Sequence, residues 1–190
     1  GGPGAPYLSA DELMQDLQVT EHALEQANSP SIAADLVRPV RRAVDELVEA
    51  GVDSIAVCLL HAYVDARHER RVVEIARERA PQLAISASHQ VLPEIREFER
   101  TSTTVVNAFV KPVVDAYLAR LESGLREARV DAPLMIMQSA GGVMKSQTAR
   151  QLPSYCIESG PAAGAVGAAA LGKLLGIPNI IAFHMGGTTA

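Results

Sequence analysis

The chain has 190 residues, of which 48% are hydrophobic and 21% charged, proportions typical of a folded globular protein and not of a disordered one. A net charge of −5 argues against the basic surface that nucleic-acid binding needs. The sequence shows neither a signal-peptide pattern nor an apolar run long enough to span a bilayer. We therefore expect a cytoplasmic protein with no nucleic-acid or membrane partner. With only 4% aromatic residues and no Trp, its core should be aliphatic.

Helical and strand-like patterns alternate along the chain. Apolar residues at helical spacing predict helices over 9–28 and 32–50, the second with Pro39 inside it. The continuous apolar run 54–60 predicts a buried parallel strand. The remaining expected elements are a helix over 68–80, a strand over 83–87, a helix over 95–129 interrupted at Lys111-Pro112, a strand over 134–138, a loop with a short helix over 139–153, a short strand over 155–157, a helix over 161–175 and a strand over 180–183. This order favours an α/β fold with a largely parallel sheet and flanking helices.

The two cysteines and the two ends of the chain lead to separate expectations. Cys58 and Cys156 stand in apolar stretches without metal-ligand spacing, so buried, unpaired thiols are expected. The chain does not begin with Met, and it stops within a Gly-Gly-Thr turn directly after an apolar strand pattern. An internal piece of a longer protein is therefore expected.

Three glycine-rich segments follow predicted strands. Ligands of α/β sheets bind at the carboxyl ends of strands, where glycine lets backbone N–H groups approach an anion and a helix N-terminus adds a favourable dipole. Each segment alone is better explained by a tight turn, and Gly164 and Gly167 also suit close helix packing; none is a Walker A loop. Together they favour phosphate binding. The candidate ligands are Gly141, Gly142, Ser159, Gly160, Gly186, Gly187, Thr188 and Thr189.

Two further polar clusters leave alternatives open. Residues 94–104 are either a solvated, salt-bridged helix start or the polar wall of a site, since consecutive hydroxyls suit a helix interior poorly unless they are bonded. Around 61–69, a metal site competes with a polar strand end followed by a helix start; the second interpretation is favoured, and no metal site is assigned. The candidate wall residues are Glu99, Arg100, Thr101 and Ser102, and the residues weighed as metal ligands are His61, Tyr63, His68 and Glu69.

These segments resemble the hydantoinase A/oxoprolinase family. The resemblance is carried by 91–110, 136–144, 158–164 and 183–189, with support from 59–63 and His68-Glu69, in register over roughly residues 45 to 190. It implies an actin/sugar-kinase/Hsp70-like ATPase core, with 1–150 as the C-terminal part of the family's N-terminal domain and 151–190 as the start of its second ATPase domain.

The resemblance also implies a chemistry. Members of the family use ATP and Mg²⁺ to hydrolyse cyclic amides, such as hydantoin, N-methylhydantoin or oxoproline, by phosphorylating an unreactive oxygen. Others are the ATPase subunits of acetone or acetophenone carboxylases, which act on ketones. A B-type hydantoinase subunit is the expected partner, and the catalytic residues stay unassigned.

The chain departs from the family pattern in ways that suggest a third alternative beside the two enzymes, a non-catalytic assembly module. The family's upstream Asp-x-Gly-Gly-Thr loop is not found among these residues, and His184 stands where the second such loop has Asp. Imidazole is a poor substitute for a carboxylate in holding Mg²⁺. These 190 residues alone are therefore not expected to turn over ATP.

Overall fold

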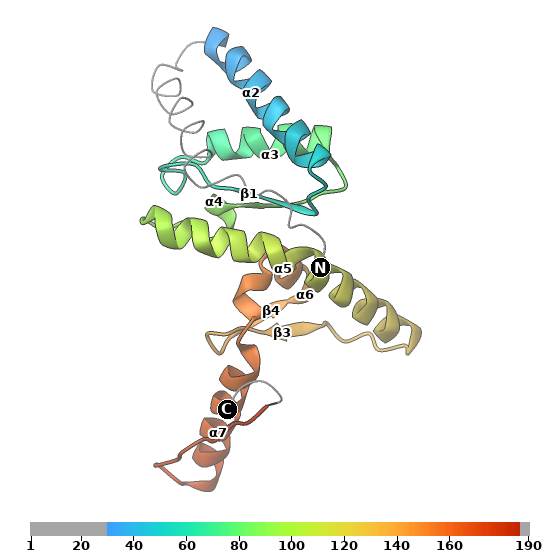
Figure 1. The fold of residues 1–190 in the computed structure, drawn as a ribbon. Helices are drawn as coiled ribbons and strands as arrows, with labels where there is room; N and C mark the ends of the chain where they lie inside the picture. Colours follow the sequence, from blue (N-terminus) through green and yellow to red (C-terminus); the bar gives the residue numbers. More distant parts are fainter. Residues whose placement is uncertain (1–29, 187–190) are drawn as a thin grey trace, which may run out of the picture. The chain divides into compact units, whose positions relative to one another are not determined.

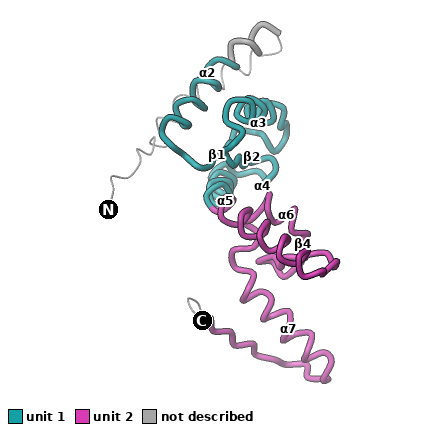
Figure 2. Tube along the Cα trace, turned by 90° about the vertical axis from the view of Figure 1, so that its right-hand side faces the viewer, with its two compact units in different colours: residues 1–109 teal, residues 110–190 magenta. Residues whose placement is uncertain are grey.

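The computed structural model describes residues 30–186 (Figure 1). The chain divides into two compact units, Gly1–Phe109 and Val110–Ala190 (Figure 2). The helix expected over 9–28 lies outside the described residues. None of the helices within 30–186 combines the length and the apolar character that crossing a bilayer requires.

Unit 1 contains a parallel pair of strands joined by a helix. In chain order it comprises α2 (Pro30–Glu49), β1 (Ser54–Val57), α3 (Arg67–Arg79), β2 (Ala84–Ala87), α4 (Ser88–Val91) and the first part of α5 (Glu97–Glu127). β1 and β2 pair in register from Ser54↔Ala84 to Val57↔Ala87. Such a pairing needs a crossover, which α3 supplies. The carboxyl ends of both strands therefore meet at one edge of the sheet.

The core of unit 1 is aliphatic, as the composition predicts. α3 places Val73, Ile75 and Ala76 on its buried face, and Val73 packs with Ile55 and Val57 of β1. A second cluster joins α2 to α3 through Val44, Ala76 and Ala80. Burial of this apolar surface ties the helices to the two strands.

Unit 2 is built on an antiparallel hairpin followed by short helices. After the second part of α5 come β3 (Met135–Met137), β4 (Val143–Lys145), α6 (Ser146–Gln151), the 3₁₀ turn η1 (Pro153–Cys156) and α7 (Ser159–Leu175). Leu118, Met144 and Ala149 form its buried cluster. α7 ends at Gly176, which has φ +70° as a left-handed C-terminal glycine should.

The expected largely parallel sheet is not what the described residues form. They contain one parallel pair, β1–β2, and one antiparallel pair, β3–β4. The connection between β3 and β4 is too short for a crossover, so the chain closes a hairpin. The fold is α/β in its elements, with the parallel arrangement confined to unit 1.

Three local expectations were wrong. α5 continues through Pro112, because long helical stretches on both sides outweigh the one backbone hydrogen bond that proline removes. Residues 155–157 are not a strand, since Pro153 opens a 3₁₀ turn there. Residues 180–183 form no strand within the described residues; they pair with no described strand, and Ile180 lies against Gly172 of α7.

The cysteines agree with expectation only in part. Cys58 and Cys156 are both free, but each is half-buried and not fully buried. Cys58 Sγ lies 3.0 Å from Thr101 Oγ1 in a hydrogen bond. Cys156 packs beside the Leu118 cluster, and its burial raises the pKa of the thiol.

Candidate functional site

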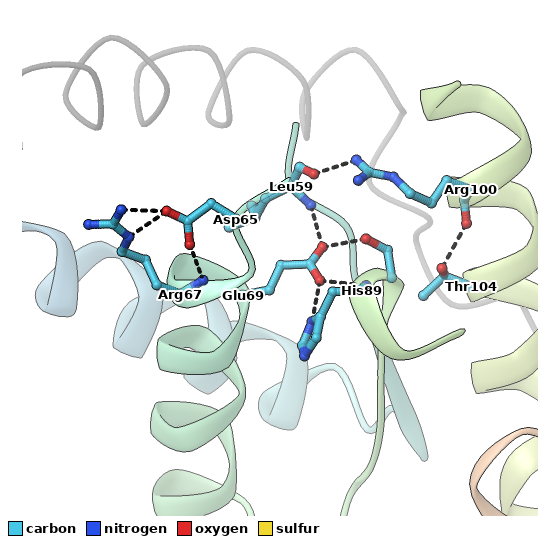
Figure 3. A network of polar contacts seen from close by, with 8 residues as sticks. Leu59, Asp65, Arg67, Glu69, His89, Arg100 and Thr104 are labelled. Atoms are coloured by element: carbon cyan, nitrogen blue, oxygen red, sulfur yellow. Dashed lines mark hydrogen bonds and ion pairs between the residues drawn. The ribbon is translucent and has the colours of Figure 1, made fainter. Parts of the chain in front are cut away.

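A buried carboxylate lies where the parallel strands of unit 1 end (Figure 3). Glu69, in the first turn of α3, is fully buried. Its Oε1 accepts hydrogen bonds from Leu59 N at 2.8 Å and Ser88 Oγ at 2.5 Å. Its Oε2 accepts from His89 N at 2.9 Å and contacts His89 Nδ1 at 2.7 Å. One side chain thus joins α3 to the segments that follow β1 and β2.

This network fixes the orientation of His89. The ring is nearly buried, with 9% of its side chain exposed. Because Nδ1 faces a carboxylate, the tautomer assigned from this contact carries its proton on Nδ1. Four donors around Glu69 offset the cost of burying its charge.

Arg100 of α5 is the second fully buried charge at this edge. Its Nη2 donates to the Leu59 carbonyl at 2.5 Å, and its guanidinium carbon lies 5.4 Å from the centre of the Tyr63 ring. Glu97 Oε1 is 3.7 Å from Nη2, beyond hydrogen-bond reach. Within the described part of the chain, Nε and Nη1 have no hydrogen-bond partner. Leu59 therefore links Glu69, through its N–H, to Arg100, through its carbonyl.

The hydroxyl row of α5 is bonded mostly within its own helix. Ser102, Thr103 and Thr104 each donate to the backbone carbonyl four residues earlier, at 2.7–2.8 Å, which satisfies hydroxyls inside a helix. The four candidate wall residues do not form one surface. Arg100 is buried, whereas Glu99, Thr101 and Ser102 are exposed, and Thr101 bonds Cys58.

The residues weighed as metal ligands do not come together. Among residues 30–186, no three His, Cys, Asp or Glu side chains are grouped as metal ligands would be. Glu69 is occupied by its donors, while the His61 ring stacks edge-on to Tyr63 at 6.1 Å. Nearby, hydrogen bonds from the side chain and the backbone of Arg67 lower the pKa of Asp65.

In unit 2 the first predicted glycine segment is the β3–β4 turn. Gln138 N donates to the Gly142 carbonyl at 2.7 Å, and Gly141 N donates to the Gln138 carbonyl at 3.0 Å. Gly141 has φ +86°, and a Cβ on it would lie 3.2 Å from Val166 Cγ2 of α7. Glycine is therefore required here both by the backbone and by the packing against α7.

Ser139 connects this turn to the start of α7. Its hydroxyl donates to the Tyr155 carbonyl at 3.0 Å and accepts from Glu158 N at 3.1 Å. Glu158 is the N-cap residue of α7, and its own side chain makes no capping hydrogen bond. A Cβ at Gly160 would meet no atom within 4 Å. The first and second predicted segments are thus neighbours, joined by Ser139 at the start of α7.

The third segment returns toward the same helix. After Gly176 the chain turns back beside α7. A Cβ built on Gly172 would lie 1.9 Å from Ile180 Cδ1. At Gly164, the corresponding position is 3.4 Å from His184 Nδ1. Residues 177–186 therefore run back along α7 toward its beginning (Figure 1). Gly187, Thr188 and Thr189 lie outside the described residues.

Sequence reasoning singled out the glycine segments and Arg100 as candidates and did not consider Ser88 and His89. Both directly follow β2, which is the signal that could have found them, because polar residues at the end of a parallel strand face the edge where ligands bind. The expected packing role of Gly167 is wrong, since a Cβ there would meet no atom within 4 Å. Gly172 has that role instead.

Two family models match the chain. The hydantoinase/oxoprolinase N-terminal region matches residues 21–80, and the hydantoinase/oxoprolinase model matches residues 100–190. Between them they cover most of the sequence, including Glu69 of unit 1 and the glycine segments of unit 2.

Two enzymes of named activity are similar in sequence to most of this chain. The alpha subunit of a caprolactamase from Pseudomonas jessenii is 33% identical over 79% of this chain and 22% of its own length. A 5-oxoprolinase from Saccharomyces cerevisiae is 34% identical over 89% of this chain and 13% of its own. The chain spans about a fifth of the length of the first curated relatives it matches.

Solved structures resemble the fold as well. An ATP-dependent caprolactamase from Pseudomonas jessenii superposes with a TM-score of 0.69 at 33% identity, over 78% of this chain and 22% of the other. A nucleotide-free acetone carboxylase gives a TM-score of 0.65 at 28% identity, over 72% of this chain and 20% of the other.

Proposed function

The chain belongs to the hydantoinase/oxoprolinase family, and from that premise we propose that it is part of an ATP-dependent enzyme that hydrolyses a cyclic amide bond. Hydantoin, N-methylhydantoin and oxoproline are the proposed substrates. Support comes from the caprolactamase and oxoprolinase relatives, whose names specify cyclic amides. Planar amides are poor electrophiles, and ATP supplies the phosphoryl group that activates the amide oxygen.

The observation that carries the proposal is the gathering of glycine segments around one helix. Ser139 bonds the N-cap of α7, and the returning chain brings His184 beside Gly164. The first turn of α7 offers the backbone N–H groups of Ser159 and Gly160 and a helix dipole, the features that bind phosphate. Gly160 adds no side chain to block an anion. The proposed phosphate ligands are Gly141, Gly142, Ser159, Gly160, Gly186, Gly187, Thr188 and Thr189.

Magnesium finds less support in the described residues. Mg²⁺ prefers carboxylate and phosphate oxygens, and residues 30–186 hold no group of three His, Cys, Asp or Glu side chains placed to bind a metal ion. We derive no step through the metal from these residues. His184 is proposed to weaken metal binding relative to the family's Asp, and His184→Asp in the complete gene product is expected to strengthen Mg²⁺-dependent nucleotide binding. If His184→Asp leaves Mg²⁺-dependent nucleotide binding unchanged, His184 has only a packing role beside Gly164.

The proposal extends to domain order and partners. Residues 1–150 are proposed to complete the family's N-terminal domain and 151–190 to open its second ATPase domain. A B-type subunit is the proposed partner, because relatives are named as alpha, beta or gamma subunits. The acetone carboxylase likeness supports a second candidate, the ATPase subunit of a ketone carboxylase.

The test is turnover by the complete gene product together with its B-type partner. ADP release and ring opening are measured with hydantoin, N-methylhydantoin and oxoproline, and in parallel with acetone or acetophenone plus bicarbonate. We expect ADP release that depends on one of the cyclic amides, with ring-opened product formed. Turnover only with a ketone and bicarbonate would select the carboxylase. No nucleotide turnover with any of them would favour the assembly module.

A further inference from the structure

We infer that Arg100 anchors an oxyanion, a carboxylate or a phosphoryl group, at the carboxyl end of β1. The guanidinium is fully buried, and its Nε and Nη1 have no hydrogen-bond partner in the described part of the chain. A buried cation with unused donors is costly to a fold. A buried guanidinium with unused N–H donors is expected where a bound ligand supplies the missing acceptors.

The hydrogen bonds of Arg100 show what is missing. An arginine side chain has five N–H donors, and the described residues provide one acceptor, the Leu59 carbonyl. Glu97 Oε1, the nearest carboxylate oxygen, is 3.7 Å from Nη2 and itself lacks a hydrogen-bond partner within the described region. Contact with the Tyr63 ring offsets part of the desolvation. The absent partner is therefore an acceptor, and guanidinium matches carboxylate or phosphate best.

The surroundings suit an anion. Arg100 lies in the first turns of α5, where the helix dipole is positive. It also lies at the edge where both parallel strands of unit 1 end, the usual ligand-binding edge of such a sheet. Leu59, which accepts its hydrogen bond, is held from the other side by Glu69. The guanidinium is thus held in place before any ligand binds.

A short turn covers the guanidinium. Residues 59–65 carry the Tyr63 ring over Arg100 (5.4 Å), and the turn is closed by Ala62 N to the Leu59 carbonyl and Val64 N to the His61 carbonyl. His61 has φ +55°, a conformation that a residue with a Cβ adopts rarely. Because the bonds that close the turn are local, Tyr63 can move aside without breaking the β1–β2 pairing. Entry of the oxyanion requires that movement.

The test compares Arg100→Met with Arg96→Met in the complete gene product. Arg96 precedes α5 and is exposed, and its ion-pair partner among the described residues is Glu99 at 3.5 Å, so Arg96→Met removes the same charge away from the buried guanidinium. Calorimetric titrations use inorganic phosphate, oxoproline, and pyrrolidone, which has the lactam ring without the carboxylate. Oxoproline is chosen because of the proposed function, whereas the phosphate titration is independent of it.

We expect Arg100→Met to weaken the binding of one oxyanion by about tenfold or more. Arg96→Met should leave it unchanged, and pyrrolidone should bind all variants alike. Loss confined to oxoproline identifies a substrate carboxylate, and loss confined to phosphate identifies a phosphoryl group. Equal binding of both oxyanions to Arg100→Met and wild type, or no binding of either to wild type, would overturn the inference. Cyclic-amide turnover that persists alongside either result would leave the proposed function standing.

Two further measurements test the inference: the melting temperature of Arg100→Met and the rate at which the oxyanion binds. The melting temperature of unliganded Arg100→Met should equal or exceed that of wild type, because an apolar residue replaces a buried charge whose Nε and Nη1 have no acceptor among the described residues. If that variant does not fold, Tyr63→Leu tests the inference alone. Removing the ring that covers the guanidinium should raise the association rate of the same oxyanion. An unchanged association rate in Tyr63→Leu would contradict the inference.

Discussion

The two units of the chain position their polar groups by different means. Unit 1 uses buried side chains, with Glu69 bonded to the N–H of Leu59 and Arg100 bonded to its carbonyl. Unit 2 uses backbone geometry, with Gly141 in a left-handed turn that packs on Val166 of α7. The difference teaches what a sequence can predict. A candidate site formed by backbone groups can be recognised from its glycines, whereas one formed by side chains can be recognised only after the pairing of the strands is known.

The units also differ in what they bury. Polar residues of unit 1 such as Thr104 and Asn107 are fully buried, and Asn107 Nδ2 donates to Ser86 Oγ at 2.9 Å. In unit 2 the buried cluster is small and apolar, while Ile181 and Phe183 after α7 are 97% and 79% exposed. Unit 1 should therefore be sensitive to lost hydrogen bonds, and unit 2 to added side-chain atoms.

The largest expected effect is that of Glu69→Ala. The substitution leaves the Leu59 and His89 N–H groups and the Ser88 hydroxyl without their acceptor, so we expect a loss of about 3 kcal/mol or more in the free energy of unfolding. The control is Glu74→Ala on the same helix, where an exposed pair with Arg71 is lost, for a cost below about 0.5 kcal/mol. Urea denaturation measures both. Equal small losses would mean that the network does not hold unit 1 together.

A smaller effect is expected from Gly141→Ala. A Cβ at φ +86° is strained and meets Val166, for a cost of about 1–2 kcal/mol. Gly142→Ala is the matched control, because the nearest side-chain atom of Gln138 would lie 3.9 Å away. If thermal unfolding shifts equally for both variants, the β3–β4 turn does not have the described geometry.

The smallest effect concerns Cys156. Burial raises the pKa of its thiol, so at mildly alkaline pH the native protein holds less thiolate than the unfolded chain. The associated stability is present below the ordinary thiol pKa and is lost as pH rises through the raised native value. Alkylation by iodoacetamide, followed by mass spectrometry, should require higher pH in the native protein than in urea. Coincident pH profiles would show that the thiol is solvated.

The sequence anticipated most helices and the first three strands, since these follow from apolar spacing. Prediction from the sequence was wrong where contacts with other parts of the chain determine the local structure. The pattern at 180–183 reads as a strand, yet no described strand pairs with it and Ile180 packs on Gly172. Pro112 suggested a break that the flanking helix overrides.

The candidate site divides in the same way. The glycine spacing in 138–164 pointed to the turn and to α7, which the structure joins through Ser139. His89 gave no motif of its own, and its contact with Glu69, twenty residues away, depends on the β1–β2 pairing. Arg100 stood out by composition, but only its burial and unpaired donors distinguish it from an exposed helix charge.

The most direct test of the central claim is nucleotide binding by Gly160→Ala in the complete gene product. A Cβ there meets no protein atom within 4 Å, and the same holds for Gly167 of the same helix, so both alanine variants should fold as wild type does. If phosphate lies at the start of α7, Gly160→Ala should weaken ATP binding by about tenfold while Gly167→Ala leaves it unchanged. Unchanged ATP binding in both variants would contradict the claim that the α7 N-terminus holds the nucleotide.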